Sequence, residues 1–296
     1  MNSPVLRVAE FAMRLVPVAA RFIPAVKRPP GVRVQTVALP GGKSRVLTPP
    51  VSSGQMPALL WIHGGGYILG AAAMDDARTG EIAARLGIMV VSVEYRLASR
   101  NPYPAPLDDC LAAWEWLVGN ADELGVDTTR LAIGGASAGG GLAASLVQRL
   151  HDMGGVQPVA QWLWCPMLDA RTADDRTLDD EDHVVWNNKD NRFGWGAYLA
   201  AGGGEYAVPA AREDLEGLPP AWISSGTIEL FYPEDIAYAE RLREAGVSTT
   251  VVEVPGAPHA VQMVARGTPT VKAYEARARE WLAGRLGTHD TELVNR

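Results

Sequence analysis

The 296-residue sequence contains only two cysteines, Cys110 and Cys165. Each lies in a segment whose pattern predicts the interior of a helix or a strand, so we expect two buried free thiols and no disulfide. Free thiols persist in reducing compartments, which predicts a cytoplasmic protein.

The sequence also lacks a basic stripe and the common metal and phosphate motifs. Its formal net charge of −7 argues against nucleic acid as a partner. No CxxC, HExxH, GxxxxGKS/T or EF-hand spacing occurs, so we expect neither metal nor phosphate chemistry.

Long apolar runs are missing as well. The uncharged apolar stretch near the N-terminus, residues 15–20, is broken by Pro17, whereas a secretory signal needs about 7–15 apolar residues. No later run approaches the roughly 20 residues of a spanning helix. We therefore expect no stable membrane insertion, and the spacing predicts a short amphipathic helix over residues 3–16.

The stretch most informative about chemistry is Gly-Ala-Ser-Ala-Gly at residues 135–139. The apolar run before it predicts a buried strand, and the Ala- and Leu-rich residues 140–150 predict a helix. A serine in a sharp strand-to-helix turn holds its Oγ clear of the backbone, and flanking glycines let strand and helix approach closely. Ser137 is therefore the candidate nucleophile; the alternative is a solvent-facing serine in an ordinary glycine-rich turn.

A second glycine-rich stretch, His-Gly-Gly-Gly-Tyr at residues 63–67, directly follows the apolar run 58–62. Attack by a serine on an acyl group creates an oxyanion, which fixed backbone N–H donors stabilise. We expect these donors to be Gly65, Gly66 and Ala138, the last being the residue after the nucleophile. His63 then shapes the turn and is not the base.

The general base must come from the five histidines. In hydrolases with this serine turn the chain order is serine, acid, histidine, which excludes His63. His259 lies on a short loop after the last predicted strand, at the carboxyl edge of a parallel sheet, and is the predicted base. Its alternative role is that of a surface loop histidine. The other three lie at a helix end, in an acidic insert and in a polar tail: His151, His183 and His289.

Glu229 follows the predicted strand 221–225 and is our first choice for the acid that orients the imidazole. Glu234 and Asp235 are rivals one turn into the next helix, and Asp169 is a rival after the strand 159–164. The alternative for Glu229 is a solvated carboxylate in a capped loop.

The remaining pattern predicts an α/β fold in one domain. Residues 32–39 and 44–47 predict an antiparallel hairpin at a sheet edge. Strands then alternate with helices, which indicates a parallel sheet covered on both faces. The strands are expected at 58–62, 88–93, 131–134, 159–164, 221–225 and 248–254, and the helices at 76–86, 106–118, 140–151, 233–245 and 270–286.

Residues 166–219 interrupt this alternation. They include six carboxylates between Asp174 and Asp182, with only Arg176 to offset them, followed by aromatic residues. A segment this long outside the strand–helix alternation of a compact domain usually covers a functional site. We expect residues 170–212 to form a cap together with about residues 1–30.

The ordered motifs resemble the hormone-sensitive-lipase-like carboxylesterases of the α/β-hydrolase superfamily. The resemblance covers about residues 58–261 and includes HGGGY at 63–67, VEYRLA at 93–98, GASAGG at 135–140 and PGAPH at 255–259. It implies an α/β-hydrolase fold with a mostly parallel eight-stranded sheet, flanking helices and a helical cap. It also implies hydrolysis of short- to medium-chain carboxylic esters through an acyl-enzyme, without a cofactor.

Two departures from the family pattern concern the site. Ala136 stands before the nucleophile where the family usually has Asp, and Glu229 stands where the acid is usually Asp. Because all three triad positions are filled, we expect an enzyme acting on a small-molecule ester rather than a non-catalytic receptor on the same fold. Amidase and acyltransferase side activities, and a homodimer, stay open.

Overall fold

The computed structural model describes residues 29–50, 54–181 and 183–291. The predicted helix over residues 3–16, and with it the N-terminal part of the expected cap, lies outside the described residues. Among the described residues, no helix is both long enough and apolar enough to span a bilayer.

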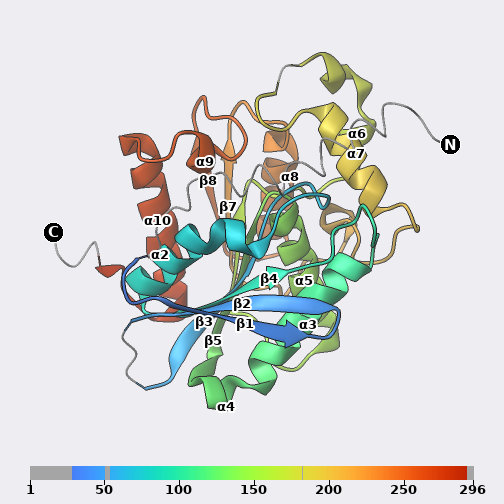
Figure 1. Ribbon diagram of the computed structural model, residues 1–296. Coiled ribbons are helices and arrows are strands. Elements are labelled where there is room, and N and C mark those ends of the chain that lie inside the picture. Colours follow the sequence, from blue (N-terminus) through green and yellow to red (C-terminus); the bar gives the residue numbers. More distant parts are fainter. Residues whose placement is uncertain (1–28, 51–53, 182, 292–296) are drawn as a thin grey trace.

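An eight-stranded sheet in the order β1-β2-β4-β3-β5-β6-β7-β8 forms the centre of the molecule (Figure 1). The β1–β2 and β2–β4 pairs are antiparallel, and every pair from β4 to β8 is parallel. This confirms the predicted hairpin and the mostly parallel sheet. The strands are β1 (Arg33–Leu39), β2 (Gly42–Thr48), β3 (Met56–Ile62), β4 (Met89–Glu94), β5 (Val126–Ala136), β6 (Ala160–Trp164), β7 (Ala221–Gly226) and β8 (Thr249–Val254).

Helices cover both faces of the sheet, as the continuous apolar strands require. One face packs against α3 (Ala105–Gly119), α5 (Ala138–Met153) and α8 (Tyr232–Glu244). The other packs against α2 (Asp76–Leu86) and α10 (Pro269–Leu286) around a cluster of tryptophans from β3, β6 and β7. Three short helices also lie outside the insert: η1 (Ala72–Asp75), α4 (Ala121–Leu124) and α9 (Val261–Val264).

Two predicted boundaries were wrong near the site. The β5 strand begins at Val126 rather than at residue 131, because its polar first half pairs with β3 across a bulge and carries no apolar run. Cys165 is the first residue beyond β6 rather than part of a strand, and its φ of 38° ends the strand. Both cysteines are free and buried, as predicted.

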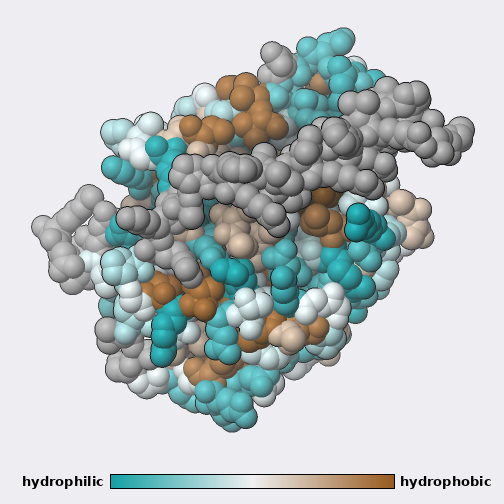
Figure 2. Space-filling view, viewed as in Figure 1, coloured by the Kyte–Doolittle hydropathy of each residue, from teal (hydrophilic) through white to brown (hydrophobic). Residues whose placement is uncertain are grey.

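The insert folds into short helices joined by irregular segments: α6 (Arg171–Asp174), η2 (Arg176–Asp180), α7 (Asn188–Tyr198) and η3 (Pro209–Ala211). Figure 1 shows α6 and α7 at one end of the molecule, beyond the helices that flank the sheet. Figure 2 shows a largely hydrophilic surface over this end.

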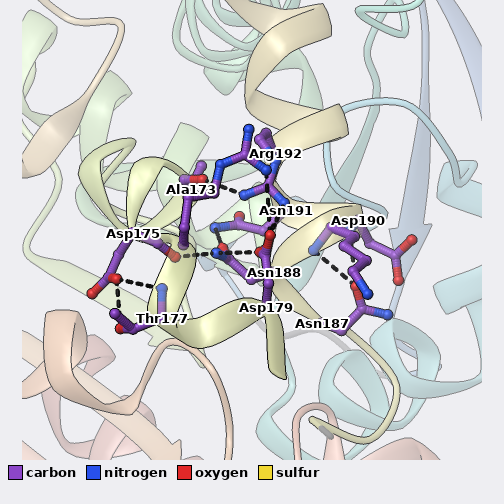
Figure 3. Close-up of polar contacts among 11 residues, drawn as sticks. Ala173, Asp175, Thr177, Asp179, Asn187, Asn188, Asp190, Asn191 and Arg192 are labelled. Atoms are coloured by element: carbon purple, nitrogen blue, oxygen red, sulfur yellow. Dashed lines mark hydrogen bonds and ion pairs between the residues drawn. The ribbon is translucent and has the colours of Figure 1, made fainter. Parts of the chain in front are cut away.

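Figure 3 shows polar contacts inside the insert that involve two residues of the acidic run, Asp175 and Asp179. Arg192 of α7 pairs with Asp179 at 2.7 Å and donates to the carbonyl of Ala173 at 2.7 Å. Asn188 donates to the carbonyl of Asp175 at 2.7 Å. Arg176 is therefore not the only cation that offsets the run, because the fold adds Arg192 from 13 residues away.

Candidate active site

Ser137 occupies the turn between β5 and α5, where the sequence predicts it. Its backbone is at φ 56° and ψ −125°, a conformation that costs a non-glycine residue energy and that characterises the serine turn of hydrolases. Its N–H donates to the carbonyl of Trp164 at 2.8 Å, which ties the turn to the neighbouring strand β6.

The loop at residues 63–67 lies directly against this turn. A Cβ on Gly64 would lie 3.3 Å from Cβ of Ser137, and one on Gly139 would lie 2.2 Å from the carbonyl oxygen of Ile62. At residue 139 only glycine permits so close an approach. The N–H groups of Gly65 and Gly66 have no hydrogen-bond acceptor among the described residues, and Ala138 is the first residue of α5, where N–H groups lack intrahelical partners. All three predicted donors are thus available to an oxyanion.

His259 and Glu229 complete a chain of hydrogen bonds with Ser137. Nε2 of His259 lies 2.9 Å from Oγ of Ser137, and Nδ1 of His259 contacts Oε2 of Glu229. All three residues are buried: Ser137 is 8% exposed, His259 is 4% exposed and Glu229 is 3% exposed. They come from three loops at the carboxyl ends of β5, β7 and β8, which parallel strands bring to one edge of the sheet.

The electrostatic surroundings of His259 favour its cationic form. Burial alone lowers the pKa of the imidazole, but the nearby Cys165 and Glu229 raise it, and the pKa ends above its ordinary value. A carboxylate on Nδ1 has the same effect in serine hydrolases generally, where it stabilises the imidazolium formed during proton transfer.

Two of the three rival acids have other partners. Asp169 pairs with Arg171 at 2.6 Å. Glu234 accepts from the N–H of Leu168 at 2.7 Å and from the hydroxyl of Thr172, which links α8 to the start of the insert. Asp235 is wholly buried, and burial raises its pKa well above the usual range.

The remaining histidines lie elsewhere. His63 contacts the carbonyl of Gly64 at 2.8 Å and stacks on Tyr95, in keeping with the predicted turn-shaping role. His151 lies near the C-terminus of α5, and His183 pairs with Glu181.

Three contributors were missed in the sequence. Oε1 of Glu229 accepts from the N–H of Gly226 at 2.8 Å and from the hydroxyl of Ser225, so both oxygens of the carboxylate are held. The ring of Phe231 meets His259 edge-on at 5.2 Å. The sequence offered one signal for the contacts of Glu229, namely the polar Ser225 at the end of an apolar strand, four residues before the acid.

The insert touches the glycine loop through Trp186. A Cβ on Gly66 would lie 2.1 Å from Cη2 of Trp186, so the indole rests on this glycine. Trp195 and Tyr198 of α7 pack on Tyr67, the residue that follows the loop. Trp186 therefore covers Gly66, one of the predicted oxyanion donors, and α7 packs against the residue that follows the loop.

A serine turn after a central parallel strand, in a sheet of this order, defines an α/β hydrolase. A family model described as alpha/beta hydrolase fold matches residues 59–263. Carboxylesterase NlhH of Mycobacterium tuberculosis is 34% identical over 251 residues, which cover 83% of this chain and 78% of that relative. The chain belongs to the hormone-sensitive-lipase-like carboxylesterases of this superfamily.

Two further relatives extend the similarity over more of the chain. Esterase LipI of Mycobacterium tuberculosis is 32% identical over 283 residues, covering 91% of this chain and 87% of the relative. A solved structure of a bacterial heroin esterase superimposes with a TM-score of 0.83 at 34% identity, covering 96% of this chain and 92% of that one.

Proposed function

We propose that this carboxylic ester hydrolase cleaves short- to medium-chain esters with Ser137 as nucleophile, His259 as general base and Glu229 as orienting acid. The observation that supports these roles is the 2.9 Å contact between Nε2 of His259 and Oγ of Ser137, with Nδ1 held by Glu229. This geometry is within reach of direct proton transfer.

Acylation follows from these contacts. Oγ of Ser137 attacks the ester carbonyl while its proton passes to Nε2 of His259. The N–H groups of Gly65, Gly66 and Ala138 stabilise the resulting oxyanion. The bond to the alcohol oxygen then breaks, and the imidazolium returns its proton to that oxygen, which leaves an acyl-enzyme.

Deacylation repeats the sequence with water. His259 takes a proton from a water molecule, whose oxygen attacks the acyl carbon, and the bond to Oγ of Ser137 breaks as the proton returns to the serine. The two proposed steps involve no redox change and no cofactor. The carboxylic acid product and the free serine remain.

The single domain carries a cap in this proposal, formed by residues 170–212 and about residues 1–30. The contact of Trp186 with Gly66 supports the first of these segments. The two buried free thiols support a reducing, cytoplasmic location. A homodimer stays a prediction, which light scattering on the purified chain would test.

The test is hydrolysis of p-nitrophenyl esters of graded acyl length, with a matched p-nitroanilide as amide control. Ser137→Ala should lower kcat by about 10⁴-fold or more with an unchanged melting temperature. Ser145→Ala, a buried serine two turns further along α5, is the control and should keep its activity. Activity of Ser137→Ala near that of the wild type would refute the nucleophile.

A further inference from the structure

A third side chain with metal-binding chemistry lies beside the His259–Glu229 pair. Sγ of Cys165, a ring nitrogen of His259 and a carboxylate oxygen of Glu229 all lie within 4.8 Å of one another. Among the described residues this is the only such group of three or more. The acyl-transfer steps proposed above make no use of the thiol.

The backbone holds Cys165 in this place. It is the first residue beyond β6, and its left-handed φ of 38° is uncommon outside glycine. Its N–H donates to the carbonyl of Ser224 at 2.7 Å, which anchors it to the next strand. The N–H of Met167 donates to the carbonyl of Ser137 at 3.0 Å, so the turn after β6 is also fastened to the nucleophile turn. The sulfur is thus positioned by the sheet edge.

The donor set is selective. Thiolate, imidazole and carboxylate are the three ligand types of protein zinc sites, with bonds of about 2.0–2.3 Å. Donor atoms around a tetrahedral ion with such bonds lie about 3–4 Å apart, so closing this group on an ion requires shifts of roughly 1 Å. Mg²⁺ and Ca²⁺ prefer several oxygen ligands and gain little from a thiolate.

We propose that Cys165, His259 and Glu229 form a binding site for a thiophilic divalent cation, zinc or cadmium, and that occupation of this site reversibly inhibits the enzyme. Binding forms a metal–sulfur bond as the thiol proton is released to solvent. The neutral imidazole supplies one ring nitrogen, and the carboxylate supplies an oxygen.

Inhibition follows whichever ring nitrogen binds. If Nε2 binds the ion, its lone pair is no longer available to the proton of Ser137. If Nδ1 binds, the remaining ring proton must reside on Nε2, which then cannot accept another. Either arrangement removes the base, so this part of the inference rests on the proposed function.

The first test measures zinc inhibition of ester hydrolysis in a buffer that does not chelate metals. Cys165→Ser keeps the size of the side chain but removes the soft ligand, and Cys110→Ser, the other buried free thiol, is the matched control. The zinc concentration for half inhibition, relative to the metal-free rate of each variant, should rise at least about ten-fold in Cys165→Ser. It should stay unchanged in Cys110→Ser, EDTA should restore activity, and Mg²⁺ should not inhibit.

The second test does not depend on turnover. Cadmium added to Ser137→Ala/Cys110→Ser should produce the ultraviolet charge-transfer band of a cadmium–thiolate bond, because this double variant keeps all three ligands. Adding Cys165→Ser should abolish the band. A band that persists without Cys165, or equal zinc inhibition of the wild type and Cys165→Ser, would overturn the site. An inactive wild type with an intact band would instead refute only the proposed function.

Discussion

Replacing Glu229 by glutamine exchanges one carboxylate oxygen for an amide nitrogen at nearly constant size. The N–H of Gly226 donates to Oε1 at 2.8 Å, and this N–H cannot accept a hydrogen bond. The glutamine oxygen should therefore face Gly226, which turns the NH₂ group toward Nδ1 of His259. The opposite orientation leaves the buried Gly226 N–H unpaired, at a cost of about 1–3 kcal/mol. That cost favours the first orientation by about 5- to 150-fold.

This orientation reverses the tautomer of the base. Nδ1 must accept from the amide, so the ring proton moves to Nε2, which faces Oγ of Ser137 at 2.9 Å. The nitrogen that should take the serine proton then already carries one. A wrong tautomer of this kind costs about 10⁴-fold in serine proteases. We expect kcat of Glu229→Gln on p-nitrophenyl butyrate to fall by about 10³- to 10⁴-fold, with KM changed less than about three-fold.

Glu234→Gln is the matched control, because it makes the same exchange at a buried glutamate that contacts Leu168 and Thr172 rather than His259. Its kcat should stay within about three-fold of the wild type. Far-ultraviolet circular dichroism should show that both variants are folded. A Glu229→Gln rate within about ten-fold of the wild type would refute the tautomer argument.

Three further predictions concern charge. Because the pKa of His259 is raised and catalysis needs the neutral imidazole, kcat/KM should increase with pH along a limb centred above 6.5; a limb at or below 6.5 would contradict the raised value. Burial raises the pKa of Glu234 to about 8 from 4.5 when unfolded, so its contribution to stability is complete below about pH 4.5 and is lost as pH rises through about 8. In urea titrations the free energy of unfolding of Glu234→Gln, relative to that of the wild type, should therefore increase by a few kcal/mol from pH 6 to pH 9 (about 1.4 kcal/mol per pKa unit). The same difference between variant and wild type at the two pH values would contradict this. Asp169→Ala should keep kcat/KM within about three-fold, since Asp169 pairs with the exposed Arg171; a larger loss than in Glu229→Ala would make Asp169 the acid.

The sequence alone determined the order of the elements and the segments that carry the site. These features are local in the sequence: apolar runs long enough for buried strands, glycines at the 63–67 and 135–139 turns, and a histidine on a short loop after the last strand. Parallel strands bring such loops to one edge, so Ser137 and His259 could be paired as candidates without coordinates. The parallel pairing of the strands from β4 to β8 and the helices on both faces of the sheet then agreed with the alternating pattern.

Tertiary structure alone decided which groups meet at that edge. Glu229 and Asp169 follow neighbouring strands, and although the sequence favoured Glu229 it left Asp169 as a rival. Only the fold shows that Glu229 contacts His259 and that Asp169 pairs with Arg171. The placement of Cys165 beside the pair had no local signal either. The periodicity of a sequence indicates which side of a strand or helix is buried. Contacts at the sheet edge depend instead on the backbone conformation of single residues and on side-chain directions, which are set by neighbours distant in the chain.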